Sequence, residues 1–168
     1  MLLPQFIRVL QMLALLAMQV LFFNHICLFG YATPMVSVAF LLYFPFNASR
    51  VGLLLWAFAM GFFTDVFSNT PGICSASMTF AAMLRPLFLR FLVTKDVVED
   101  MIPTYSSMGT WTHIRFIICL TILHHLVYFA LESFSVAHSV DAFFSFLSSL
   151  LLTLLVIFVL ERFRSNTK

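Results

Sequence analysis

Hydrophobic residues occur along this chain in long blocks, which short polar segments separate. Six apolar stretches, separated by polar breaks, cover residues 9–29, 33–46, 51–67, 73–93, 111–131 and 140–160. A helix needs roughly 20 mostly apolar residues to cross a bilayer, and most of these stretches approach that length. The pattern therefore predicts an all-α polytopic membrane protein, a six-transmembrane-helix bundle that forms one integral membrane domain over residues 1–168.

The polar breaks mark the ends of some predicted spans more clearly than others. A cluster of turn formers at residues 68–72 ends the third stretch, and the longest polar stretch, residues 94–110, is the predicted main loop. The second stretch is short and aromatic, with Pro34 at its start and Pro45 near its end, so it is either little tilted or begins earlier. No A-x-A-like cleavage site follows the first stretch, which we expect to be an uncleaved span.

The composition agrees with burial in a bilayer. Of the 168 residues, 62% are hydrophobic and 10% are charged, whereas soluble domains have about 25% charged residues. Too little polar surface remains to cover a water-soluble globule. The net charge of +2 gives no reason to expect a nucleic-acid partner.

The basic residues predict the orientation. Six spans put both termini on one side, and seven basic residues then lie in or beside the connections of that side: Arg8, Arg50, Arg90, Lys95, Arg162, Arg164 and Lys168. Arg85 and Arg115 lie inside spans but nearer the same side, and the connections of the other side contain no lysine or arginine. Five or seven spans would scatter the basic residues over both faces. The positive-inside rule therefore predicts a multi-pass membrane protein with both termini cytoplasmic.

Two predicted spans have a face of small residues that ends in a charged residue, with the members spaced four residues apart. These faces are Ala57, Gly61 and Asp65 in the third span, and Ser77, Ala81 and Arg85 in the fourth. Small residues let two helix backbones approach closely. We therefore expect the third and fourth spans to pack through these faces.

The two charged residues of these faces each have two interpretations. Asp65, roughly 20 Å along its helix from Val51, either enters a packed interface or bonds the turn at residues 68–70. An ion pair with Arg85 would have to bridge an axial gap of roughly 10 Å. A reach of Arg85 toward cytoplasmic headgroups is therefore favoured over a buried role. Pro86 cannot donate a hydrogen bond to the preceding turn and should kink or loosen the helix.

His124 and His125 are adjacent in the fifth span. Adjacent helical side chains point about 100° apart, so these two cannot chelate one ion together. We expect interhelical hydrogen bonds from them, with a proton relay or metal binding as weaker alternatives. Ser145, Ser149 and Thr153 form a polar stripe in the sixth span, which should pack against another helix. No Cys or His spacing predicts a metal site, and no cofactor is expected.

No motif indicates an enzyme. The sequence has neither a nucleophile elbow nor a Walker A loop. A small enzyme of lipid metabolism would need a cluster of acidic metal ligands, and the loop acids Asp96, Glu99 and Asp100 are better explained as a solvated face. Cys27 and Cys74 both lie near the predicted outer side, where a disulfide is chemically permitted, but free buried thiols are the default.

A family resemblance rests on short motifs. The segment GFFTDVFS at residues 61–68, followed by Gly72 and a helix rich in small residues, resembles the G-x-x-x-D...G signature of MreD proteins. The later stretches LRP at 84–86, SMG at 107–109, and HHLV at 124–127 with Glu132 are similar to MreD proteins of the Bacteroidetes type. The positions that match these motifs are Gly61, Asp65, Gly72, Arg85, Pro86, His124 and His125.

The resemblance implies a non-catalytic membrane subunit of the cell-elongation (rod) complex, which supports cell shape and lateral peptidoglycan synthesis. The implied partners are MreC directly, and MreB and the elongation-specific wall synthases indirectly. The implied fold is similar to the six-helix substrate-binding subunits of energy-coupling-factor vitamin transporters. On this basis we expect the polar and small faces to hold the bundle together and to present a surface to MreC.

A competing interpretation is a substrate-binding subunit of a vitamin importer. Such a subunit should have a ligand cavity with convergent polar groups near the outer half of the bundle. Asp65, His124 and His125 are candidates for its lining. Against this function, the predicted spans are poor in Asn, Gln and Tyr.

Overall fold

The computed structural model describes residues 2–23, 33–93, 101–133 and 139–166, and within these ranges the regular elements are all helical. The elements in chain order are α1 (Leu2–Leu21), the 3-10 helix η2 (Val36–Tyr43), α2 (Arg50–Ser68), α3 (Ile73–Leu92), α4 (Tyr105–Met108), α5 (Thr110–Ser133) and α6 (Ser139–Asn166). The predicted all-α class is confirmed for the described part of the chain.

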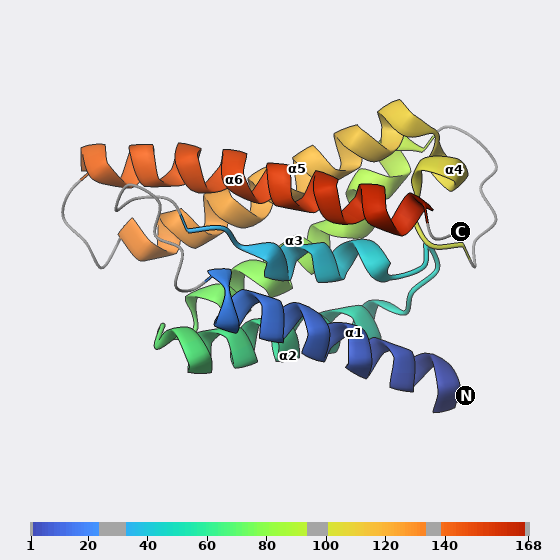
Figure 1. Cartoon of the computed structure of the whole chain (residues 1–168), viewed down its shortest axis with the longest axis horizontal. Coiled ribbons are helices and arrows are strands. Elements are labelled where there is room, and N and C mark those ends of the chain that lie inside the picture. Colours follow the sequence, from blue (N-terminus) through green and yellow to red (C-terminus); the bar gives the residue numbers. More distant parts are fainter. Residues whose placement is uncertain (1, 24–32, 94–100, 134–138, 167–168) are drawn as a thin grey trace.

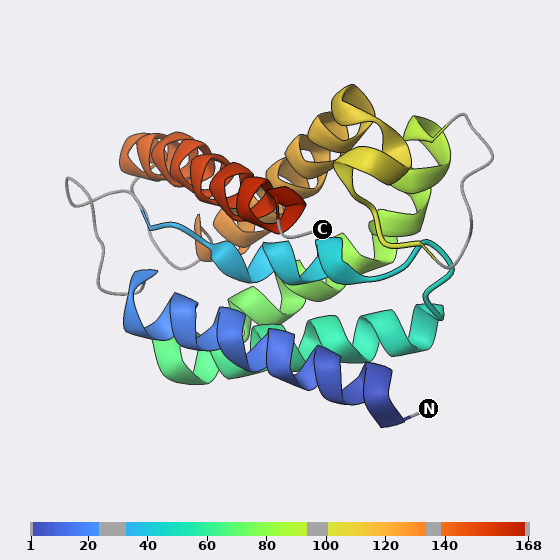
Figure 2. The ribbon, with the colours of Figure 1, turned by 45° about the vertical axis from the view of Figure 1, so that its right-hand side comes forward.

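The long helices and η2 run alternately in opposite directions, so that both ends of the chain lie at the same end of the bundle (Figure 1). Helices α1 and α2 lie on one side and α5 and α6 on the other, with η2 between them (Figures 1 and 2). The η2 segment accordingly contacts α1, α2, α5 and α6, while α3 packs most extensively against α2 and α5. The η2 segment therefore lies at the centre of the bundle.

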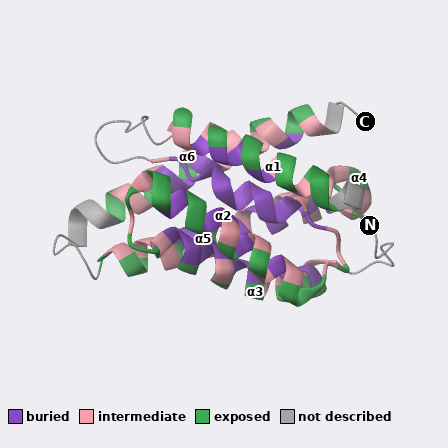
Figure 3. Ribbon diagram, turned by 90° about the horizontal axis from the view of Figure 1, so that it is seen from below, coloured by how far each residue is buried: buried purple, intermediate pink, exposed green. Residues whose placement is uncertain are grey.

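The exterior of the bundle is apolar, whereas many polar side chains are buried. Large hydrophobic residues such as Leu55, Phe62 and Leu151 are exposed, and the mean hydropathy is +1.03. Exposed positions lie along the outer sides of the helices, and buried positions face the centre (Figure 3). Among the described residues, three helices are long and apolar enough to cross a membrane, namely 50–68, 110–133 and 143–164, and 5–21 is a shorter apolar helix. These apolar helices indicate a membrane protein, because water would not support such a surface.

The second predicted stretch differs in form from a regular α-helix. Its helical part is the 3-10 helix of eight residues, and Phe44, after its end, is extended. Phe44 precedes Pro45, and a proline disfavours helical backbone at the residue before it. A 3-10 helix rises about 2.0 Å per residue and extended backbone about 3.3 Å, compared with 1.5 Å for an α-helix. This explains how so few residues pass through the length of the bundle.

The first helix begins and ends earlier than the predicted stretch, and the last helix is longer than its stretch. Helix α1 begins at Leu2, seven residues before the predicted start at residue 9, and includes Arg8, whose guanidinium lies 5.2 Å from the centre of the Phe44 ring. This contact accommodates the charge in an apolar helix. Helix α6 continues to Asn166, beyond the predicted end at residue 160. The predicted main loop contains the short α4, which begins with a capping box formed by Thr104 and Ser107.

Candidate functional site

The signature residues form the corner where α2 turns back into α3. At Gly61 the two backbones are in direct contact, because a Cβ placed there would collide with the Cα of Ser75 and the carbonyl of Cys74. Gly72 lies at the start of α3 with φ of 79°, a conformation that favours glycine. Both glycines are therefore required by backbone geometry.

Asp65 caps the N-terminus of α3 from the neighbouring helix. Its carboxylate accepts hydrogen bonds from the backbone N–H of Cys74 at 2.9 Å and of Ser75 at 2.7 Å, and from the Thr70 hydroxyl at 2.5 Å. The first N–H groups of a helix have no partner within the helix and lie at its positive end, so a carboxylate is favoured there. Both interpretations of Asp65 hold in part, because it bonds the turn and lies, 5% exposed, in a packed interface.

Arg85 corrects one expectation from the sequence. Its side chain is only 1% exposed and does not reach the headgroups. Its Nη2 donates to the Phe44 carbonyl at 2.5 Å and its Nη1 to the Pro45 carbonyl at 3.4 Å, so it does not pair with Asp65. The extended end of η2 leaves carbonyl groups without helical donors, and buried carbonyl groups need partners. Arg85 supplies these partners.

The other end of η2 is held by side chains of α1 and α6. Gln19 donates to the Pro34 carbonyl at 3.0 Å and accepts from the Val36 N–H at 2.7 Å. Ser149 accepts from the Thr33 N–H at 3.0 Å, and Thr153 accepts from the Met35 N–H at 2.9 Å. Non-helical backbone at membrane depth is tolerated only where the protein satisfies its polar groups. We define these contacts, together with those of Arg85, as the η2 clamp.

Gln19 was not among the candidate residues that the sequence predicted. Its signal was an amide side chain in an apolar stretch, which becomes informative only once a segment with unpaired backbone groups lies beside it. The polar stripe of α6 was identified, and two of its members, Ser149 and Thr153, are fully buried against the start of the η2 segment.

The two histidines make the expected interhelical hydrogen bonds. His124 Nε2 lies 3.2 Å from the Ser77 hydroxyl on α3. His125 Nε2 lies 3.0 Å from the Thr153 hydroxyl on α6, and its Nδ1 lies 3.0 Å from the Thr121 carbonyl. The rings thus bond different helices. Among the described residues, no group of three His, Cys, Asp or Glu side chains lies close enough together to hold a metal ion.

Thr153 offers a direct test of the η2 clamp. Replacing it with valine keeps the shape but removes the oxygen that accepts from Met35 N–H and bonds His125. We expect Thr153→Val to lower the free energy of unfolding by about 1–3 kcal/mol, the cost of a buried unsatisfied group. Thermal unfolding in detergent measures it, with Thr153→Ser as the control that keeps the hydroxyl. Equal stability of the valine and wild-type proteins would contradict the clamp.

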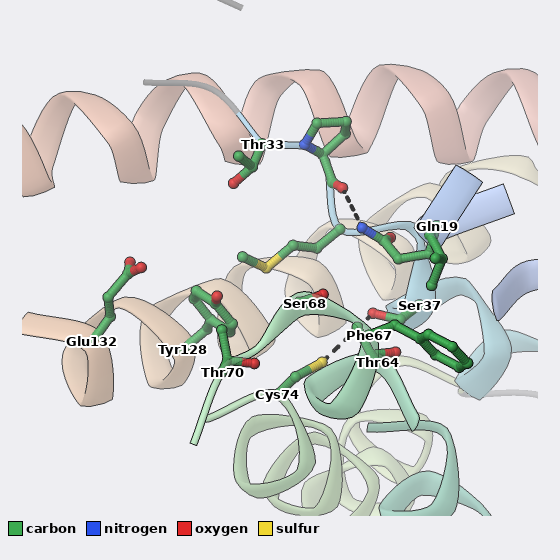
Figure 4. A pocket seen from close by; sticks show the side chains of 13 residues that line it. Gln19, Thr33, Ser37, Thr64, Phe67, Ser68, Thr70, Cys74, Tyr128 and Glu132 are labelled. Atoms are coloured by element: carbon green, nitrogen blue, oxygen red, sulfur yellow. Dashed lines mark hydrogen bonds between the residues drawn. The ribbon is translucent and has the colours of Figure 1, made fainter. Parts of the chain in front are cut away.

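A cavity of about 420 Å³ lies beside the start of the η2 segment and the α2–α3 corner (Figure 4). Polar side chains of five segments line it, including Gln19, Thr33, Ser37, Thr64, Thr70 and Glu132. Among the described residues of this lining, Glu132 is the only charged one. Asp65, His124 and His125, the candidates for such a lining, are not among its residues, because their polar groups bond helix α3, the Thr70 hydroxyl and helix α6.

A second polar cluster lies at the opposite end of the bundle. Glu161 Oε2 lies 3.0 Å from both His113 Nε2 and Arg164 Nη2, and Arg164 also donates to the Pro103 carbonyl at 2.8 Å. Burial and the Glu161 carboxylate raise the pKa of the Tyr105 phenol, whose ring contacts His113. Glu161 and Arg164 lie beyond the predicted end of the sixth span at residue 160, and the sequence pattern did not single out His113, since only tertiary packing brings α5 and α6 together here.

Small residues at helix contacts, buried polar groups that hold an irregular segment, and an apolar exterior are features of helical membrane proteins. Comparisons of the chain with protein-family models, with curated proteins and with solved structures find no match. Cys27 and the acids Asp96, Glu99 and Asp100 lie outside the described residues, so the disulfide stays an alternative to free thiols and the solvated loop face stays a prediction.

Proposed function

We propose that the chain crosses the bacterial inner membrane six times, with both termini in the cytoplasm. Two features support this topology beyond the apolar helices. The η2 segment and α3 run the length of the bundle (Figure 1), and the polar side chains Ser75, Ser77 and Arg85 of α3 are turned away from the exterior. The described arginines also gather toward the end of the bundle where both chain ends lie, which suits the positive-inside rule.

We further propose that the protein is a non-catalytic, MreD-type subunit of the cell-elongation complex that acts through MreC. The α2–α3 corner carries this proposal. Its geometry needs a residue without Cβ at Gly61, a carboxylate at Asp65 and positive φ at Gly72. These are the positions of the G-x-x-x-D...G signature, so the resemblance involves residues that define one structural element.

The surface for MreC should lie outside the small-residue faces. Ala57, Ser77 and Ala81 are fully buried within the monomer, so they hold the bundle together and leave no surface for a partner span. This corrects the expectation that these faces also contact MreC. The proposed partner span instead has the apolar exterior of the bundle available, where association depends on close packing.

The proposal is tested by depleting the protein in its native bacterium and following cell shape and the sites of new peptidoglycan insertion. We expect rounded cells, restoration by the wild-type gene, and MreC among the proteins that copurify. Asp65→Leu is a control for folding, which should fail to restore shape because less folded protein is present, whereas Ala76→Leu, a change at an exposed position of α3, should restore it. Normal shape after depletion would contradict the proposal, particularly if an ATPase-containing transport complex copurified.

The 420 Å³ cavity favours a second candidate, a substrate-binding subunit of a small-molecule importer. Its volume falls in the range of about 300–1,000 Å³ typical of small-molecule sites, and polar groups converge on it. With Glu132 as the only charge among the described residues of the lining, we expect the ligand to be neutral or cationic. Mass spectrometry of small molecules released from the purified protein tests this candidate. A bound compound that is lost in Ser37→Phe would support it, and an empty protein would count against it.

A further inference from the structure

A second concave site lies between the first turn of α2 and the last turns of α3. This space of about 240 Å³, which we call the arginine groove, has Arg50 and Arg90 at its edges and Leu54, Met83, Pro86 and Leu87 among its apolar walls. It lies at the end of the bundle where α2 begins and α3 ends, the same end as both chain ends (Figure 1). The groove thus combines cationic and apolar surface in one place.

The two arginines of the groove have no partner among the residues that the structure describes. Three other arginines are engaged, because Arg8 lies over the Phe44 ring, Arg85 bonds carbonyl groups and Arg164 bonds Glu161. Arg50 and Arg90 are both exposed. Within the part of the chain that the structure describes, two guanidinium groups beside an apolar wall thus have no internal acceptor, and guanidinium groups bind anions such as phosphate.

The start of α2 adds to the positive potential of the groove. Ser49, which precedes the helix, makes no side-chain capping bond, and the first intrahelical bond is donated by Leu53. The N–H groups of the first turn thus have no helical acceptor, and the helix dipole is positive here. Both effects favour a negatively charged group beside Arg50.

From this combination we propose that the arginine groove binds an anionic phospholipid of the cytoplasmic leaflet. The phosphate lies between Arg50 and Arg90, and an acyl chain lies along Leu54, Met83 and Leu87. Basic pockets between membrane helices on the cytoplasmic side suit such headgroups. A free phosphate has nothing to cover the apolar wall, and a zwitterionic headgroup adds a cation that the arginines repel. The inference rests on the proposed orientation and not on a role in cell shape.

Native mass spectrometry of the full-length protein, released from detergent with added phosphatidylglycerol or phosphatidylcholine, tests the groove. The variant is Arg50→Gln/Arg90→Gln. The control is Arg115→Gln/Arg162→Gln, which removes the same charge from exposed positions of α5 and α6 outside the groove. Basic residues near an anionic surface contribute about 1 kcal/mol each. We therefore expect the preference for phosphatidylglycerol to fall about tenfold or more in the groove variant and less than about twofold in the control.

Three outcomes would overturn the proposal. Equal losses in both variants would indicate general surface electrostatics, and an unchanged preference in the groove variant would exclude the two arginines. Displacement of the lipid by excess inorganic phosphate would indicate an anion site without a lipid. Arg50→Lys/Arg90→Lys, which keeps the charge, should retain most of the preference. Because the assay uses purified protein, its failure is distinguishable from failure of the proposed cell-shape function.

Discussion

Replacing Gly61 with leucine is expected to lower the midpoint of thermal unfolding by about 10 °C or more. The new side chain would begin inside the backbone of Cys74 and Ser75, which cannot give way as a flexible side chain would. Overpacking of this kind costs about 3 kcal/mol or more when backbone must move, and each kcal/mol shifts the midpoint by about 2–4 °C in a protein of this size. Leucine favours a helix over glycine by about 1 kcal/mol, so helix propensity alone would predict that this variant is more stable than wild type.

The matched control for Gly61→Leu is Ala76→Leu. Ala76 is exposed on α3, next to the residue that Gly61 contacts, so the same kind of bulk is directed outward there. We expect its midpoint to stay within about 2 °C of wild type, since exposed changes are usually within about 0.5 kcal/mol. Size-exclusion chromatography after heating in detergent measures both variants. A Gly61→Leu protein as stable as wild type would contradict the contact between α2 and α3 at this position.

Replacing Asp65 with leucine is expected to destabilise the protein by about 3 kcal/mol. The change leaves the N–H groups of Cys74 and Ser75 buried without acceptors and removes the bond from Thr70. Hydrogen bonds to a charged group contribute about 1.5–3 kcal/mol each, and the helix dipole adds to the loss. Asp65→Asn should lose less, because its single carbonyl oxygen can still accept from one of the two N–H groups.

The rate at which Cys74 reacts shows whether Asp65→Leu opens the α2–α3 corner locally or destabilises the whole protein. Cys74 is 3% exposed beside the Asp65 cap, so its reaction with a maleimide reports the opening of the start of α3. With Cys27 and Cys119 replaced by serine, Asp65→Leu should label faster than Asp65→Asn, which should label faster than wild type. Thr153→Val, which lies in the η2 clamp, should change this rate least. Equal labelling of all four proteins would show that Asp65 does not hold the corner closed.

Together these variants separate a role in folding from a role in partner binding. The corner is an internal joint of the monomer, so substitutions at Gly61 and Asp65 should reduce the amount of folded protein before they affect any partner. A change of cell shape at normal folded levels would instead need a residue of the exterior. Tests of MreC binding are therefore best made with exposed positions, with the corner variants as controls for folding.

The cleanly bounded helices were predictable because local signals define them. The predicted stretches 51–67 and 73–93 correspond to α2 and α3 within one residue at each end, since the turn formers at 68–72 lie between two long apolar runs. The second stretch was harder, because its apolar residues do not distinguish an α-helix from a 3-10 helix with extended ends. Its form depends on side chains that lie far from it in sequence, among them Gln19, Arg85 and Thr153.

The sequence by itself determined that the chain is helical and apolar, where its main breaks fall, and which small or charged residues share a helix face. These properties follow from composition and from the 3.6-residue period, which are local. The tertiary structure alone decided what the polar residues bond. Asp65 caps the next helix, Arg85 turns inward to the end of η2, and His113 meets Glu161, because buried polar groups take whichever partners the packing of distant segments brings within reach.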